Sequence, residues 1–239
     1  MLCIDNTNTD VYFNLAAEEY LLKNLQEDIL MLWQSTPAVV IGKYQCVENE
    51  VNIDYTKKHN IRIARRMTGG GAVYHDLGNL NISYIKRYSP GDYSGFTGRL
   101  AEFLSPLVDG LRTDERNNLF INDMKISGSA QCVHKDASLH HCSLLFSSQL
   151  DKLYASLLPV GAHVKLQIKA VESVRSKVTN MQDHLIRKIN FRELKMMILK
   201  SFLNCRGENR IHQFSESEQL AIGQLASEKY ISSSWIFRF

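Results

Sequence analysis

Three consecutive glycines constrain this chain more than any other feature of its sequence. Gly69, Gly70 and Gly71 lie between two runs that are typical of strands, Ile61 to Ala64 and Ala72 to Tyr74. Glycine adopts backbone angles that other residues avoid, and it lets a ligand approach the main chain closely. Two arginines precede this turn, and main-chain N–H groups beside guanidinium groups suit a phosphate or a carboxylate. The segment therefore predicts either an anion-binding turn or a tight turn with solvated arginines.

Two well-known glycine motifs do not fit this turn. It lacks the Gly-Lys-Ser/Thr ending of a Walker A loop. No helix follows it in an alternating strand–helix unit, which the dinucleotide-binding fingerprint requires.

Composition narrows the class of protein. Of the 239 residues, 44% are hydrophobic and 22% are charged, which excludes a disordered or collagen-like chain. A net charge of +3 is too small to predict nucleic-acid binding. No apolar run approaches the roughly 18–20 residues of a membrane span, and no secretory signal is visible. We expect a cytoplasmic protein with free thiols, because its cysteines are scattered and form no Cys-x-x-Cys pair: Cys3, Cys46, Cys132, Cys142 and Cys205.

The apolar pattern predicts an α+β fold, with mixed or antiparallel sheets packed against helices in one domain over residues 1–239. Leu30 to Trp33 and Ala38 to Ile41 are expected to be two strands joined by the turn Ser35-Thr36-Pro37. Asn122-Asp123 is expected to be a hairpin turn. The other strands are expected within 61–64, 72–74, 79–85, 119–121, 125–127 and 138–146, and the helices within 14–24, 53–59, 96–108, 150–157, 191–203 and 215–228, the last opened by a capping box.

Three further segments carry residues suited to chemistry. Lys125 lies in a strand flanked by Asn, Ser and Gly, where a lysine can draw a carboxylate and a phosphate together or simply face solvent. His140 and His141 point to opposite faces of a strand, so they cannot share one metal, and we expect one to be buried and one exposed. Lys165 to Val178 is either a basic loop that closes over a substrate or a solvated face.

Together and in this order, these segments resemble the lipoate–protein ligase A family of the biotin/lipoate ligase superfamily. The resemblance covers nearly the whole chain. Its segments are Asn14 to Glu19, Pro37 to Gln45, Glu50 to Asn52, Arg65 to Asn81, Lys125 to Gln131, Leu139 to Phe146, Ser173 to Asn180 and the ending Glu228 to Trp235.

The resemblance implies the catalytic-domain fold of these ligases and a two-step reaction. Lipoate attacks the α-phosphate of ATP, with Mg²⁺ as cofactor, and gives lipoyl-AMP and pyrophosphate. A lysine then takes the lipoyl group. That lysine belongs to a lipoyl domain of a 2-oxoacid dehydrogenase or to glycine cleavage H protein. No nucleic acid or membrane is implied as a partner.

The resemblance also assigns the site residues. Lys125 is implied as the catalytic residue, in contact with the lipoyl carbonyl and the α-phosphate. Asn117 is implied to hold phosphate and Mg²⁺, His75 to lie near the phosphates, and His141 to lie near the lipoyl channel. The remaining binding residues are Arg65, Arg66, Gly70, Gly71, Ala72, Ser129 and Ala130, with Lys169, Ser173 and Arg175 on a loop over the adenylate; Val39, Ile41 and Val73 are candidates for an apolar tunnel.

Three departures from the family pattern stand out. Asn118 replaces the usual aspartate, and an amide is a weaker Mg²⁺ ligand than a carboxylate. Cys142 replaces a glycine, and Cys132 a polar or basic residue. The chain also ends where many bacterial ligases continue into an accessory domain. We therefore expect a catalytic unit without that domain, which acts alone, with a separate small partner, or in one half-reaction only.

Two other functions stay open. One is an ATP-independent octanoyl or lipoyl transferase that carries the acyl group as a cysteine thioester, for which Cys132 or Cys142 would have to form a thiolate. The other is a non-catalytic protein that binds lipoate or its adenylate. A nucleic-acid-binding module is a remote third, because the net charge is small.

Overall fold

The computed structural model describes residues 1–87, 94–157, 170–202 and 210–238. Its strands form one eight-stranded and one three-stranded sheet. The large sheet contains β1 (Leu2–Asn6), β2 (Ile29–Trp33), β6 (Asn79–Arg87), β7 (Leu111–Thr113), β8 (Leu119–Ile121), β9 (Met124–His134), β10 (Ala137–Leu145) and β11 (Arg210–Ile211). The small sheet contains β3 (Ala38–Ile41), β4 (Arg62–Arg65) and β5 (Val73–His75).

The large sheet is mixed. Its strand order is β11-β1-β2-β6-β10-β9-β8-β7, with β1 parallel to both neighbours and the other pairs antiparallel. In the small sheet, of order β4-β3-β5, β3 runs parallel to β4 and antiparallel to β5. The prediction of an α+β fold with mixed and antiparallel sheets is confirmed.

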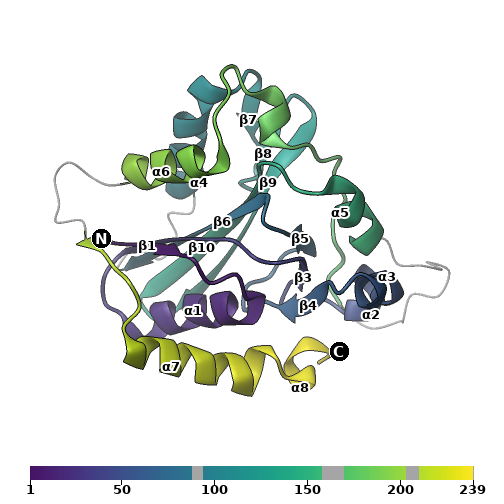
Figure 1. The fold of residues 1–239 in the computed structure, drawn as a ribbon, viewed down its shortest axis with the longest axis vertical. Helices are drawn as coiled ribbons and strands as arrows, with labels where there is room; N and C mark the ends of the chain where they lie inside the picture. Colours follow the sequence, from purple (N-terminus) through teal and green to yellow (C-terminus); the bar gives the residue numbers. More distant parts are fainter. Residues whose placement is uncertain (88–93, 158–169, 203–209, 239) are drawn as a thin grey trace.

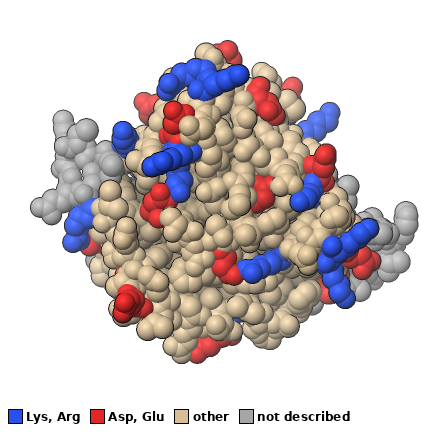
Figure 2. All heavy atoms as spheres, in the orientation of Figure 1, with Lys and Arg blue, Asp and Glu red and all other residues tan. Residues whose placement is uncertain are grey.

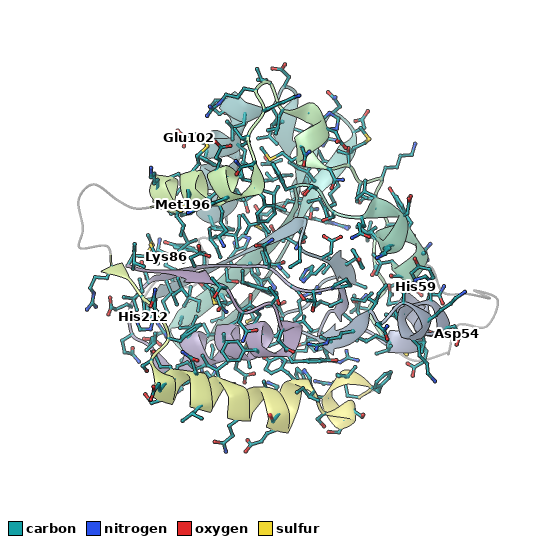
Figure 3. The ribbon with its side chains drawn as sticks, in the orientation of Figure 1. Asp54, His59, Lys86, Glu102, Met196 and His212 are labelled. Carbon is teal, nitrogen blue, oxygen red and sulfur yellow. The ribbon has the colours of Figure 1, made fainter. Side chains whose placement is uncertain are left out.

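Helices cover both faces of the large sheet (Figure 1). The helices of the described residues are α1 (Val11–Asn24), α2 (Val47–Glu50), α3 (Ile53–Lys58), α4 (Ser94–Leu104), α5 (Leu150–Leu157), α6 (Phe191–Phe202), α7 (Glu216–Leu225) and α8 (Ser233–Ile236), with 3₁₀ turns at Ser105–Leu107 and Met181–His184 and a π-helix at Ala226–Tyr230. Of these, α4 and α6 cover one face of the large sheet, and α1 with α7 covers the other. Met196 on α6 and Glu102 on α4 lie on one side, and His212, just before α7, lies on the other (Figure 3).

Three hydrophobic clusters follow from this layering. One lies between the large sheet and α4 with α6, and the second lies between the opposite face and α1 with the C-terminal helices. The third joins the small sheet to α2, α5 and α8. Because both faces of the large sheet are covered, β2 is buried at all five positions and shows no alternation of polar and apolar residues.

The first two strand runs are strands, as predicted, but they do not pair with each other. Ala38–Ile41 does not return alongside Ile29–Trp33; it enters the other sheet. The connection is held away from a hairpin, because the Thr36 main chain bonds to Thr9 and the Pro37 carbonyl accepts from Arg62. The two sheets therefore meet at this connection.

Other local predictions hold. The hairpin at Asn122-Asp123 joins β8 to β9, and Ser215 and Glu218 form the expected capping box. Helix α1 begins before Asn14, because the Asp10 side chain caps it by accepting from the Tyr12 and Phe13 main chain.

No helix within the described ranges is long and apolar enough to cross a membrane. On the face shown in Figure 2, basic and acidic side chains are interspersed, and no continuous basic patch forms there.

Candidate active site

Two adjoining cavities lie where the small sheet meets β9 and β10. The polar cavity, of about 470 Å³, is lined by charged and polar side chains that include Glu18, Arg66 and His75. The apolar cavity, of about 320 Å³, is lined by residues that include Leu145, Leu153 and Leu157. Eight residues line both cavities, so they mark the junction: Ala72, Val73, Lys125, Gly128, Ser143, Ser173, Val174 and Ser176.

Lys125 stands at this junction. Its main chain is fixed on both sides, because its N–H donates to Lys177 and its carbonyl accepts from Thr179. A Cβ atom on Gly128 would lie 3.2 Å from both Cε and Nζ of Lys125, so the glycine leaves room for the ammonium group. Burial lowers the Lys125 pKa, an effect that Asp114 opposes and Arg116 reinforces. Strand β9 thus places one cation at the point where the two cavities join.

The glycine turn packs backbone against backbone. A Cβ atom on Gly42, at the end of β3, would lie only 2.0 Å from the Gly70 carbonyl oxygen. Gly70 itself has a φ of +86°, a left-handed angle that glycine adopts at little cost. These two positions explain why the sequence needs glycine here.

Arg66 holds the turn from the cavity side. Its guanidinium donates to the carbonyls of Gly69 (2.6 Å), Gly71 (2.8 Å) and Val40 (3.1 Å). Its Nε donates to Thr68 Oγ1 at 3.0 Å. Burial lowers the Arg66 pKa to about 10, so the group stays charged at neutral pH. A buried cation therefore both organises the turn and faces the polar cavity.

A chain of hydrogen bonds continues from Arg66 to the inner end of this cavity, which is the part lined by Glu18, Trp33, His75 and His141. Since Arg66 donates to Thr68 Oγ1, the threonine hydroxyl can donate to His141 Nε2 at 2.9 Å. His141 Nδ1 then donates to Glu18 Oε1, also at 2.9 Å. Within the described part of the chain, three residues that line this cavity each have one buried side-chain atom without a hydrogen-bond partner: Glu18 Oε2, His75 Nδ1 and Asn81 Nδ2. Not every polar atom around the inner end is therefore paired within the protein.

His75 lies at this inner end, edge-on to the Trp33 ring at 5.6 Å between centroids. Burial lowers its pKa to about 3, and the charges of Arg66 and His141 act in the same direction. A neutral ring beside Trp33 is poorly suited to phosphate. The structure places His75 among the residues that line the inner end of the polar cavity, and its position near the phosphates stays a prediction.

A covering loop, residues 170–179, closes the junction from the other side. Ser173 Oγ accepts from the Ala72 main chain (2.8 Å) and from Gln45 Nε2 (2.9 Å), and the Ser173 N–H donates to Glu50 (3.0 Å). Val171 bonds to the Tyr44 carbonyl. The expected position of Ser173 and Arg175 over the site agrees with this geometry, while Lys169 lies outside the described residues.

The outer end of the polar cavity holds Asp114, Arg116 and Asn118. Asn117, expected to bind phosphate and Mg²⁺, is not among the lining residues of either cavity. Its φ is +59°, and its carbonyl accepts from Ser129 Oγ at 2.7 Å. The left-handed turn at Asn117 thus brings the neighbouring residue, Asn118, to the cavity.

Arg65 also differs from the expectation. It is fully buried, and its guanidinium donates to main-chain carbonyls on both sides rather than lining a cavity: those of Gly42, Lys43, Gln45, Trp235 and Ile236. The alternation of side chains along β4 explains this, because Arg65 and Arg66 point in opposite directions. Val39 and Ile41 are likewise buried in the third cluster, and it is Val40 that lines the polar cavity.

The remaining expected residues converge. One group of cavity-lining residues consists of Arg66, Gly70, Gly71, Ala72, Val73, His75, Lys125, Ser129, Ala130, His141, Ser173 and Arg175. Sequence reasoning missed Glu18, Trp33, Glu50, Asp114 and Tyr154. Glu18 gave no signal, because a glutamate in an amphipathic helix is expected to face solvent, and here α1 is covered on both sides.

The histidine pair and the described cysteines are mostly buried. His140 and His141 do face opposite sides, but both are buried, because helices cover both faces of the sheet. The four described cysteines are free thiols. Burial raises the pKa of Cys132 and of Cys142 to about 12. No group of three His, Cys, Asp or Glu side chains among the described residues is arranged to hold a metal on its own.

Known proteins share both sequence and structure with this chain. Lipoate–protein ligase 1 of Staphylococcus aureus is 34% identical over 98% of this chain and 73% of its own length. A Thermoplasma acidophilum protein solved with bound lipoic acid superimposes with a TM-score of 0.82, at 27% identity over 99% of this chain and 98% of its own. A bi-partite lipoate protein ligase of that organism, studied with its E2 lipoyl domain, gives 0.83 at 29% identity, over 98% and 95% of the two chains.

A lipoate-protein ligase A solved with ATP gives a TM-score of 0.80 at 26% identity, over 98% of this chain and 97% of its own. Residues 10–203 match the family described as the lipoyl protein ligase A/B catalytic domain. Sequence and fold agree, and this chain belongs to the lipoyl protein ligase A/B catalytic domain family.

Proposed function

We propose that this chain activates lipoate with ATP to form lipoyl-AMP and pyrophosphate, and then transfers the lipoyl group to a lysine of an acceptor protein. The observation that carries the proposal is the position of Lys125 at the junction of two cavities. Relatives bind lipoic acid in one case and ATP in another, which supports two ligands that meet at one point.

The residues present suit the first step. The carboxylate of lipoate and the α-phosphate of ATP are both negative, so their approach needs cations and N–H donors. Lys125 supplies a cation at the junction, and Arg66 and Arg116 supply two more along the polar cavity. As the carboxylate oxygen bonds to the α-phosphorus, the bond to pyrophosphate breaks, and Lys125 stabilises the negative charge that develops there.

The cavities divide the ligands between them. We assign the lipoyl tail to the inner end of the polar cavity, beside Trp33 and His141, and the phosphates to its outer end, beside Arg116. The nucleoside then fits the apolar cavity, against Tyr74 and Tyr154. The covering loop shields the mixed anhydride from water until the acceptor amine attacks its carbonyl carbon and releases AMP.

Magnesium belongs to this proposal as the companion of the nucleotide. When bound, it offsets phosphate charge during the displacement. The outer end of the polar cavity carries the oxygen ligands that it accepts, from Asp114 and Asn118. One or two protein ligands suffice, since phosphates and water complete the coordination.

The proposed acceptors are the lipoyl domains of 2-oxoacid dehydrogenases and glycine cleavage H protein. A separate small accessory protein is a further proposed partner, for which the bi-partite ligase of Thermoplasma acidophilum is the precedent.

The test uses the purified chain with lipoate, ATP, Mg²⁺ and an apo lipoyl domain. Lipoyl-AMP and pyrophosphate are expected in the absence of acceptor, and intact mass should show one lipoyl group gained by the domain. Lipoyl-AMP without transfer would indicate one half-reaction or a missing accessory protein. Binding of lipoate and ATP without pyrophosphate would replace this proposal with the non-catalytic one.

A cysteine-dependent transferase is less well supported. Its thiol would have to form a thiolate, and burial opposes this for Cys132 and Cys142. Transfer from a lipoyl-carrying donor without ATP would establish it.

A further inference from the structure

Asp114 brings a fixed carboxylate into the outer end of the polar cavity. Its Oδ1 accepts from the main-chain N–H groups of Arg116 (3.0 Å) and Asn118 (2.8 Å). Its Oδ2 accepts from Asn118 Nδ2 at 2.8 Å. Three donor atoms of one short turn therefore hold this carboxylate in place, with little freedom to withdraw from whatever enters the cavity.

This carboxylate is ionised at neutral pH. Its two oxygens accept three hydrogen bonds, which favour the charged form of a carboxylate. The positive charge of Lys125 acts in the same direction. A full negative charge thus lies near the lysine at the junction.

That charge conflicts with the ligand expected at this end. The phosphates of a nucleoside triphosphate carry several negative charges, and a fixed carboxylate repels them in a partly buried site. A divalent cation between the two removes the conflict, because Mg²⁺ commonly binds through one or two carboxylates together with substrate phosphates. The carboxylate therefore favours nucleotide binding only when the metal is present.

Asn118 contributes a neutral oxygen to the same end of the cavity. Its Nδ2 is used by Asp114, so its Oδ1 faces another way. A Cβ atom on Gly128 would lie 3.8 Å from that Oδ1 and 3.2 Å from Lys125 Nζ, which places both atoms around the same small space. Asn118 also occupies the position where the family resemblance leads one to expect aspartate. The structure shows that Asp114 accepts a hydrogen bond from Asn118 Nδ2, so a carboxylate lies next to this position.

We propose that Asp114 is the anionic protein ligand of the divalent cation that enters with the nucleotide, and that Asn118 is its neutral neighbour. The inference rests on the proposed activation of lipoate by ATP. It adds a residue that the family pattern does not point to.

The test measures nucleotide binding rather than turnover. The probe is α,β-methylene-ATP, which cannot be cleaved between the α- and β-phosphorus atoms, titrated calorimetrically with Mn²⁺ or with EDTA. The variants are Asp114→Asn and the exchange Asp114→Asn/Asn118→Asp, in which the hydrogen bond between the two side chains is kept and the charge moves. Asp123→Asn is the matched control, because Asp123 is exposed on the neighbouring hairpin and lines neither cavity.

In the wild type, Mn²⁺ should tighten binding of the analogue by at least about tenfold, the scale on which supporting contacts affect metal sites. In Asp114→Asn, Mn²⁺ should no longer tighten binding of the analogue. The affinity of this variant for the analogue without metal should rise, because the carboxylate no longer repels the phosphates. In the exchange variant, Mn²⁺ should again tighten binding of the analogue. Asp123→Asn should bind the analogue as the wild type does, with and without Mn²⁺. A merely structural role for the Asp114 turn predicts no rise in metal-free affinity and no rescue.

Two results would overturn the proposal. One is that Mn²⁺ tightens binding of the analogue to Asp114→Asn as much as to the wild type. The other is that the exchange variant melts like the wild type but binds the analogue no more tightly with Mn²⁺ than without it. Its failure is separable from failure of the proposed function. If the wild type forms lipoyl-AMP while Mn²⁺ still tightens binding of the analogue to Asp114→Asn, only the ligand assignment is wrong. If the wild type binds no analogue with or without Mn²⁺, both proposals are wrong.

Discussion

The side-chain oxygen of Ser173 lies 2.8 Å from the main-chain nitrogen of Ala72 and accepts its hydrogen. This bond joins the covering loop to the end of the glycine turn, 101 residues earlier in the chain. Gln45 donates to the same oxygen from the connection after β3. Three segments of the site are thus tied together at one hydroxyl group.

Ser173→Ala is expected to loosen the covering loop without unfolding the protein. It removes two hydrogen bonds, each with a net contribution of about 1 kcal/mol. Main-chain amides within 171–178 should exchange hydrogen faster, and lipoyl-AMP should be lost to hydrolysis sooner. Ser227→Ala, an exposed serine on the π-helix, is the control. Equal exchange in the two variants would contradict a role for Ser173 in holding the loop.

Lys125→Ala should lower the rate of lipoyl-AMP formation by about 10²-fold or more, the usual cost of removing one group that stabilises developing charge. Pyrophosphate release is the measurement. Gly128→Ala tests position rather than charge, because the added methyl group would lie 3.2 Å from the Lys125 ammonium and displace it. Full adenylation by Lys125→Ala would remove Lys125 from its assigned role.

Replacing Cys132 and Cys142 by alanine should leave ATP-dependent lipoylation unchanged. With pKa values of about 12, these thiols hold thiolate on the order of one part in 10⁵ at neutral pH. Intact mass of an apo lipoyl domain, followed with and without ATP, reports the outcome. Loss of transfer in a folded double variant would favour the thioester mechanism.

Stability should fall as the pH drops below about 6.5, partly because of His75. Its folded-state pKa of about 3 lies below the unfolded value of about 6.5, so the unfolded chain binds more protons between these two pH values. The contribution is complete above pH 6.5 and is lost by about 1.4 kcal/mol per pH unit toward pH 3. Urea unfolding at pH 7, 6 and 5 measures this slope. His75→Phe, which keeps a ring beside Trp33, should flatten it, whereas the same change at exposed His59 should not.

Much of the site was predictable from sequence because it is built on local patterns. The glycine turn, the Lys125 strand and the loop with Ser173 each carry their residue types within a short stretch. What failed depended on which way a side chain points. Arg65 and Arg66 are chemically identical neighbours, and only the packing of β4 sends Arg66 to the polar cavity and Arg65 into the interior.

Residues that come from distant elements were also beyond the sequence patterns. Glu18 is buried because it points from α1 to Ser83 and His141 on the large sheet, and Asp114 is held at the cavity by the main chain of Arg116 and Asn118. Sequence patterns also do not predict that Ala38–Ile41 and Ile29–Trp33 lie in different sheets. An apolar run identifies a strand but not the strand with which it pairs.

The contacts of Arg65 have a consequence for how the protein is made. Its guanidinium bridges the carbonyls of Gly42 and Gln45 to those of Trp235 and Ile236, about 170 residues further along. During synthesis on the ribosome, the glycine turn emerges long before the residues that complete its support. The buried charge of Arg65 must therefore stay solvated until Trp235 and Ile236 have been made, so the glycine turn becomes rigid only after about 170 further residues have been added.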